Sequence, residues 1–152
     1  MTAANASSLN DGAAALVVMS EAAAEAAGAT PLAVIRGYGD AATKPIDFTI
    51  APSMALPVAL ERAGVALGDV DYFEFNQAFS VVSIANQRLL DLDPERIDVF
   101  GGAVALGHPI GCSGARIITT LLSVLKAKDA TVGAAAICNG GGGASAIVVE
   151  RL

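Results

Sequence analysis

The only histidine of the chain, His108, stands between a glycine and a proline, directly ahead of a segment with helical spacing. The N-terminus of a helix carries positive potential, which disfavours a protonated imidazole. A neutral ring can act as a base or donate a hydrogen bond to an oxygen atom. Four nearby glycines would let the backbone approach a ligand closely: Gly101, Gly102, Gly111 and Gly114. Without this context, His108 could equally be a simple turn residue.

A second candidate is the thiol of Cys138, which ends an apolar segment and is followed by Asn139 and four consecutive glycines. A cysteine at the end of a strand is most often a small core residue. Four glycines in a row would weaken a core, but they can aim backbone N–H groups at a developing oxyanion, as acyl chemistry requires. In that setting the thiol could serve as a nucleophile or as a proton carrier.

The remaining polar candidates have ordinary structural explanations that the residues alone leave open. Asn76 lies between a predicted strand and a predicted helix, where it could cap the helix or take part in catalysis. Ser7 and Ser8 could simply cap a turn, and Cys112 has no neighbouring base, which favours a structural role. With one histidine, two distant cysteines and no clustered carboxylates, a zinc or iron site is not expected.

The composition bounds the class of protein. The chain has 152 residues, enough for one domain, and a domain of this size buries about two-thirds of its unfolded surface without disulfides. Nine Lys and Arg against fifteen Asp and Glu give a net charge of -6, which offers no electrostatic footprint for nucleic acid. No apolar run reaches the roughly 18 residues of a membrane helix, and residues 1–10 do not look like a signal peptide. We therefore expect a cytoplasmic protein with reduced thiols that binds neither nucleic acid nor membrane.

Strand-like and helix-like segments alternate along the chain, which predicts an α/β fold. Strands are expected at 14–19, 32–38, 71–75, 97–100, 131–138 and 145–150, helices at 21–27, 53–63, 78–90 and 115–128, and a loop at 42–52. Ser20 and Ser53 are candidate N-caps, and Gly28 and Gly64 mark helix ends. The 32 alanines and few aromatic residues indicate a core built by close backbone approach. The strands look too few to cover both faces of a layered sheet, which favours part of a larger unit over a small complete domain.

Three segments, taken together and in this order, resemble the C-terminal signatures of the thiolase family: NQAF at 76–79, GGAVALGHPIGCSGAR at 101–116 and CNGGGGASA at 138–146. The opening, TAANASSLNDGAAA at 2–15, is similar to the segment that leads out of the thiolase loop domain. The segment DAATKPIDFTIAP at 40–52 is similar to the pattern of the acetyl-CoA acetyltransferase branch. Related ketoacyl synthases share the fold but have a second histidine where this sequence has Cys138, so the cysteine separates the two families.

The resemblance implies a fold of two similar α/β halves stacked as a five-layer sandwich, of which this chain would be the second half. We accordingly expect a layered α/β/α arrangement in which helices cover a mixed sheet. Residues 1–30 would lead in from the loop domain and the end of the N-terminal half, and residues 31–152 would form the thiolase C-terminal domain. The implied reaction joins two acetyl-CoA molecules into acetoacetyl-CoA and CoA, or reverses that step, and requires no cofactor.

The resemblance also implies roles for the matching residues. His108 would activate a nucleophilic cysteine and donate to a thioester oxygen, while Cys138 would move the α-carbon proton. Asn76 would hold the water that completes a first oxyanion hole, and Gly140 would offer its N–H to a second. Substrate contacts would be Ser7, at the pantetheine, with Ala78 and Phe79. Some members of the acetoacetyl-CoA branch bind potassium through backbone carbonyls, for which the candidates here lie near Ala3, Ala4, Ala6 and Val104.

Two departures from the family pattern count against a working enzyme. The nucleophilic cysteine of the family lies in the N-terminal half, so this chain alone is expected to be inactive and to need such a half, or a homo-oligomer, as its partner. Gln77 stands where the family pattern has Glu, which removes a charge and bears on the pKa of Cys138. The alternatives are a truncated, non-catalytic chain that binds a partner or CoA, and a thiol hydrolase that uses Cys138 and His108.

Overall fold

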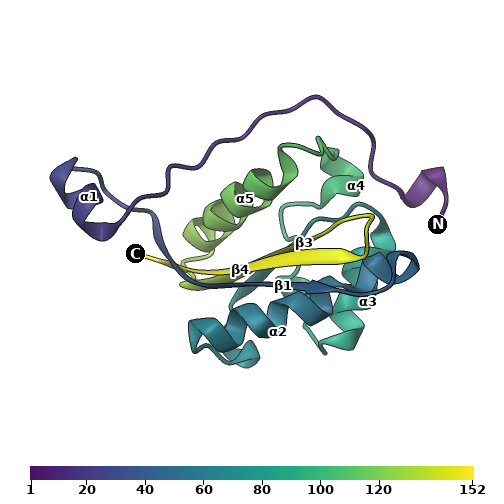
Figure 1. Ribbon diagram of the computed structural model, residues 1–152. Coiled ribbons are helices and arrows are strands. Elements are labelled where there is room, and N and C mark those ends of the chain that lie inside the picture. The colour runs from purple at the N-terminus through teal and green to yellow at the C-terminus, as the bar shows by residue number, and fades with distance from the viewer.

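A four-stranded mixed sheet forms the centre of the computed structural model, which describes residues 1–152 (Figure 1). The strands are β1 (Ala33–Ala42), β2 (Tyr72–Phe75), β3 (Val132–Cys138) and β4 (Gly143–Arg151), and their order in the sheet is β1-β4-β3-β2. β4 pairs antiparallel with both β1 and β3, whereas β2 runs parallel to β3. The parallel pair opens at its carboxyl ends on one edge of the sheet, where ligands bind in many α/β proteins.

Helices cover both faces of this sheet, so the expected α/β/α layering is confirmed. α2 (Pro52–Ala63) packs against β1 and β4 and contacts α3 (Ser80–Leu89), while α5 (Ser113–Ala127) covers β2 and β3 on the opposite face (Figure 1). The shorter elements are α1 (Glu21–Ala26), α4 (Ala103–Leu106) and the 3-10 helices η1 (Ala3–Asn5), η2 (Pro45–Ile50), η3 (Leu67–Asp69) and η4 (Pro94–Arg96). None of the helices combines the length and the apolar character that a membrane crossing requires.

Glycine and alanine let α2 lie very close to β1. A Cβ atom added to Gly37 would come within 2.5 Å of the carbonyl oxygen of Ala59, and one added to Gly39 within 2.8 Å of the Ala59 nitrogen. On α2, Ala55 and Ala63 are buried as well. Both distances are shorter than a van der Waals contact, so this packing requires glycine at the two strand positions. The expectation of a core built by close backbone approach is confirmed.

The start of α2 differs from the prediction by one residue, and its end agrees. Ala51 is the N-cap and Pro52 the first helical residue, where the missing N–H of proline costs nothing. Ser53, expected as the cap, instead donates its backbone N–H to Oδ1 of Asn86 on α3 at 2.8 Å. Gly64 ends the helix in the left-handed conformation at φ 66, as its position after the last apolar residue predicts.

Two of the predicted strands are wrong. Residues 14–19 form an extended, irregular segment that passes over the α5 side of the sheet towards α1 (Figure 1), and Val17 is 84% exposed because no strand lies beside this segment to pair with it. Residues 97–100 make a single bridge, between Ile97 and Phe73, before Asp98 turns the chain at φ 48. The predicted loop at 42–52 contains η2, and the other predicted elements are present with shifted ends.

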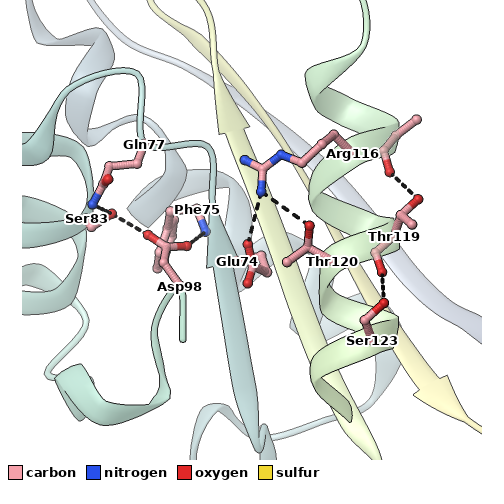
Figure 2. Close-up of polar contacts among 10 residues, drawn as sticks. Glu74, Phe75, Gln77, Ser83, Asp98, Arg116, Thr119, Thr120 and Ser123 are labelled. Atoms are coloured by element: carbon pink, nitrogen blue, oxygen red, sulfur yellow. Dashed lines mark hydrogen bonds and ion pairs between the residues drawn. The ribbon is translucent and has the colours of Figure 1, made fainter. Parts of the chain in front are cut away.

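A carboxyl group and a guanidinium face one another inside the fold, between β2 and α5 (Figure 2). Glu74 is only 1% exposed, and its Oε2 lies 3.6 Å from Nη1 of Arg116. Neither oxygen of Glu74 accepts a hydrogen bond, whereas Nη1 of Arg116 donates to Thr120 Oγ1 at 3.4 Å. Burial and the nearby Asp98 raise the pKa of Glu74 to about 8, although Arg116 opposes the shift. The carboxyl group of Glu74 is therefore mainly protonated at neutral pH.

The substitution Gly37→Ala should destabilise the chain by about 1–3 kcal/mol, because the new Cβ overlaps the backbone of α2 and the helix must move. Denaturant unfolding measures this loss. Gly68→Ala is the matched control, since nothing lies within 4 Å of a Cβ at that position, and its effect should stay within about 0.5 kcal/mol. Equal stability of the two variants would contradict the close packing of α2 on β1.

The buried carboxyl of Glu74 should make the folded chain less stable as the pH rises. The unfolded chain ionises Glu74 near pH 4.5, while the folded chain keeps the proton up to about pH 8, so proton binding favours the folded state across this window. Glu74→Gln removes the titration, and this variant should gain stability over the natural chain between about pH 5 and pH 9, by a few kcal/mol. Unfolding curves at both pH values test the claim; a difference that does not change with pH would show that Glu74 ionises normally.

Candidate active site

The site lies at the carboxyl ends of β2 and β3, where separate parts of the chain meet. Asn76 directly follows β2, Cys138 ends β3, and His108 lies in the loop between α4 and α5. The N-terminal segment is joined to this edge, because the backbone N–H of His108 donates to the carbonyl oxygen of Ser8 at 3.0 Å. The fold therefore brings residues that are far apart in the sequence to one edge of the sheet.

Both ring nitrogens of His108 have a polar partner. Nε2 lies 3.1 Å from Nδ2 of Asn76, and Nδ1 lies 2.6 Å from Oγ of Ser113, which is also 3.0 Å from the carbonyl oxygen of Pro109. The single hydroxyl proton of Ser113 allows two arrangements. If Ser113 donates to Pro109, Nδ1 carries the ring proton and Nε2 accepts from Asn76. If Ser113 donates to Nδ1, the ring proton is on Nε2.

The imidazole of His108 is mainly uncharged at neutral pH. Burial lowers its pKa, and the positive charge of Arg116 lowers it further. The neutral ring that we expect from the sequence is thus confirmed, although its causes are burial and an arginine rather than the end of a helix. A neutral imidazole can take a proton from a thiol or donate its N–H to a carbonyl oxygen.

The thiol of Cys138 is buried at the end of β3, and burial raises its pKa. A tight turn follows, in which Oδ1 of Asn139 accepts from the backbone N–H groups of Gly141 at 3.0 Å and Gly143 at 3.3 Å. The N–H of Gly140 makes no hydrogen bond within the chain, and there is open space around its α-carbon. It is therefore free to meet an oxygen atom of a ligand.

A cavity of about 550 Å³ opens at this edge of the sheet. Its wall includes six residues that the sequence singles out: Ser7, Ala78, Phe79, His108, Cys138 and Gly140. Phe48 adds to the apolar side of the wall and packs edge-on against Phe79, with 6.1 Å between ring centroids. A ligand in this cavity would meet an imidazole, a thiol and a free backbone N–H, which are the groups that acyl transfer requires.

Asn76 stands behind His108 and does not line the cavity. Its side chain is fully buried, and its Oδ1 has no hydrogen-bond partner. Because unpaired buried oxygens are rare, Oδ1 is a place where a water or a ring N–H would complete a bond. The alternative role of Asn76 as a helix cap is wrong, since α3 begins at Ser80 and its N-cap residue is Phe79.

Two residues of the site received no role from the sequence. Ser113, fully buried at the first position of α5, contacts Nδ1 of the ring, and Arg116 on the same helix lowers the pKa of His108. Both belong to the segment GHPIGCSGAR, so their spacing after His108 was visible. Spacing alone did not show that the first turn of the helix would fold back onto the ring.

The other sequence candidates lie away from the cavity. Cys112 is buried and unbridged and does not line it, which agrees with a structural role. No group of three or more His, Cys, Asp or Glu side chains is placed to hold a metal ion. Of the potassium candidates, Ala3 and Ala4 lie in η1, Ala6 follows it, and Val104 lies in α4. A carbonyl site between these elements stays a prediction.

Known proteins similar to this chain share one family. Residues 29–151 match the family described as thiolase, C-terminal domain. An acetyl-CoA acetyltransferase of Saccharomyces cerevisiae is 58% identical over 153 residues, covering 100% of this chain and 38% of the yeast protein. The crystal structure of the Bacillus anthracis acetyl-CoA acetyltransferase is 46% identical with a TM-score of 0.96, covering 99% of this chain and 38% of that chain. The Acat5 thiolase from Ascaris suum, solved in complex with coenzyme A, is 43% identical with a TM-score of 0.89 over 99% and 39% of the two chains.

The chain thus spans little more than a third of the length of the relatives it matches, while nearly all of it is matched. The agreement covers the sheet, the helices on both of its faces and the glycine-rich segments around the cavity, because the matched region runs from before β1 to the last residue of β4. The chain therefore belongs to the thiolase family, and residues 29–151 are its thiolase C-terminal domain.

Proposed function

We propose that the chain supplies the C-terminal catalytic residues of an acetyl-CoA acetyltransferase, which joins two acetyl-CoA molecules into acetoacetyl-CoA and CoA or catalyses the reverse reaction. The nucleophilic cysteine comes from an N-terminal half, in the same polypeptide or in a partner, and no cofactor is required. The observation that supports this best is that His108, Cys138 and Gly140 line one cavity. Two unbridged thiols favour a reducing compartment such as the cytoplasm.

Forming the new carbon–carbon bond requires the removal of a proton from the carbon next to a thioester. Cys138 suits this task, because a thiol whose pKa is raised by burial gives a strongly basic thiolate once it ionises. The electron pair left on the α-carbon is delocalised onto the thioester oxygen. The resulting enolate attacks the acyl group held on the nucleophilic cysteine, and the sulfur of that cysteine leaves with the bonding pair.

Two oxygen atoms gain negative charge during this sequence, and each needs its own donors. The enolate oxygen would be met by Nε2–H of His108 and by a water held by Asn76. The oxygen of the tetrahedral intermediate would be met by the free N–H of Gly140. Donation from Nε2 requires Ser113 to give its proton to Nδ1, and acceptance of the nucleophile's proton at Nε2 requires the other arrangement, so the hydroxyl of Ser113 serves both steps.

An incompletely covered face of the sheet supports the need for a second half. α5 packs on β2 and β3 and leaves a hollow towards β1, lined mainly by apolar residues that include Tyr38, Ile117, Ile118, Ile137 and Ile147. Tyr38 is 65% exposed there. Apolar surface of this kind is normally covered by another layer or subunit. We assign it to the N-terminal half, with residues 31–152 as the domain and 1–30 as the lead-in; a second copy of the chain is the other cover.

Mixing the chain with an N-terminal thiolase half that bears the nucleophilic cysteine should give thiolysis of acetoacetyl-CoA above the rate of either component. In this mixture His108→Ala and Cys138→Ser should each lower the rate by about 10²- to 10⁴-fold, the usual share of a positioned acid or base. Cys112→Ser is the matched control, because that thiol lies outside the cavity, and it should keep the rate.

A mixture no faster than its components would contradict the proposed function. In that case, coenzyme A binding without turnover would indicate the non-catalytic alternative. An acyl group trapped on Cys138 would indicate the thiol hydrolase.

The hydroxyl of Ser113 should control which nitrogen of His108 carries the proton. Ser113→Ala should lower the rate of the mixture by about tenfold to a hundredfold, because the ring loses the group that can donate to Nδ1. Since His108 is the only histidine, nitrogen NMR of the ring shows its tautomer directly, and the Nε2–H form should become rarer. Ser123→Ala, on the exposed side of the same helix, is the control. The same tautomer populations in all three chains would contradict the role of Ser113.

A further inference from the structure

A row of hydrogen bonds that the proposed mechanism does not use runs from Gln77 to the edge strand β2 (Figure 2). Nε2 of Gln77 donates to Oγ of Ser83 on α3 at 3.3 Å, and Oγ of Ser83 donates to Oδ2 of Asp98 at 2.6 Å. The other carboxylate oxygen of Asp98, Oδ1, accepts from the backbone N–H of Phe75 at 2.8 Å. The row joins the end of β2, the helix α3 and the turn after Ile97.

Each proton in this row has only one place to go. The amide nitrogen of Gln77 and the backbone N–H of Phe75 can only donate, and an ionised carboxylate can only accept. The hydroxyl of Ser83 has one proton, and because its oxygen already receives a bond from Gln77, the proton goes to Asp98. The row is therefore complete with a single negative charge. With a carboxylate at each end, two acceptors would compete for the one proton of Ser83.

The surroundings of Asp98 can accommodate one negative charge but not two. Burial raises the pKa of Asp98 to about 6, while the bonds from Ser83 and Phe75 and the charge of Arg116 lower it. Glu74 faces the same region and is mainly protonated at neutral pH, so it adds little charge. Arg116 is the one cation acting on Asp98, and its contact is with Glu74. A second buried carboxylate would lack a partner, which is strongly unfavourable.

Asp98 connects this row to the candidate active site through β2. Its backbone N–H donates to the carbonyl oxygen of Phe73 at 2.9 Å, and its side chain accepts from the N–H of Phe75. Asp98 thus bonds to β2 much as a neighbouring strand would, immediately before Asn76. Since Nδ2 of Asn76 lies 3.1 Å from Nε2 of His108, a loosened end of β2 would change that contact.

We propose that Gln77, Ser83 and Asp98 form a relay with one charge, which positions Asn76 against His108. The relay explains how this chain has Gln77 where the family pattern has Glu: the single charge sits at the opposite end, on Asp98. It would work equally in reverse, because a carboxylate at position 77 and an amide at position 98 would send the proton of Ser83 the other way and leave every donor paired. The inference rests on the proposed function only for the catalytic roles of Asn76 and His108.

The substitution Gln77→Glu (Q77E) tests the relay through the pH dependence of stability. It places a carboxylate on each side of Ser83, so the folded chain holds a proton between them that the unfolded chain releases above about pH 4.3. Relative to the natural chain, the unfolding equilibrium constant should rise by up to about tenfold per pH unit above that value, until the shared proton is lost. Gln77→Met removes the donor without adding charge, and its loss of stability should not depend on pH.

The reversed relay supplies the decisive control. Q77E/D98N should recover the pH dependence and most of the stability of the natural chain, whereas D98N alone gives Ser83 two donors and should be destabilised. The ring signals of His108, the only histidine, should shift in Q77E and in Q77M and return in the double variant. These measurements on the 152-residue chain require no turnover, so they separate the relay from the proposed reaction.

Three outcomes would overturn the relay. A double variant that is no more stable than Q77E, or that does not fold, would show that the two positions are not coupled. A Q77E variant whose loss of stability is the same at low and high pH would show that no proton is shared. Ring signals of His108 that are identical in every variant would show that the row does not position the site.

Discussion

The hydrogen bond between the amide of Asn76 and the imidazole of His108 is the contact on which the site depends. It joins the carboxyl end of β2 to the loop that leads into α5, with 3.1 Å between the two nitrogens. Asn76 is fully buried, and the far side of the ring is held by Ser113, so neither group can move without breaking a hydrogen bond in a region of low polarity. The position of the imidazole in the cavity is therefore fixed by the packing of sheet and helix, rather than by the conformation of one loop.

The parallel pairing of β2 and β3 explains why the sulfur of Cys138 faces the same cavity. Phe75, the residue before Asn76, pairs with Ala136, two residues before Cys138, so both strands end on one edge of the sheet. The return into β4 then has to be tight: a Cβ at Gly142 would lie 2.3 Å from the carbonyl oxygen of Thr43, at φ 94. The glycines that make this return possible also leave the N–H of Gly140 unpaired, so the same residues serve the packing and the chemistry.

The sequence predicted the groups around the cavity better than some of the elements that carry them. His108, Cys138 and Gly140 belong to glycine-rich segments whose residue types are distinctive wherever the chain places them. The strand predicted at 14–19 is wrong because an apolar run indicates burial only if something covers it, and here the segment is exposed. Asp98 could not be foreseen, because its side chain replaces strand pairing through bonds to residues 15 and 23 positions away.

Burial moves the two acid–base groups of the cavity in opposite directions, lowering the pKa of His108 and raising that of Cys138. Both shifts favour the uncharged form, so the resting site presents a neutral imidazole and a neutral thiol. Desolvation is the first cause of each shift, and a cover over the cavity would remove more water and extend both shifts in the same directions. The proposed second half would therefore supply the nucleophile and also strengthen the basicity of the Cys138 thiolate and the neutrality of the His108 ring. The acid–base properties of this chain are in that sense completed from outside it.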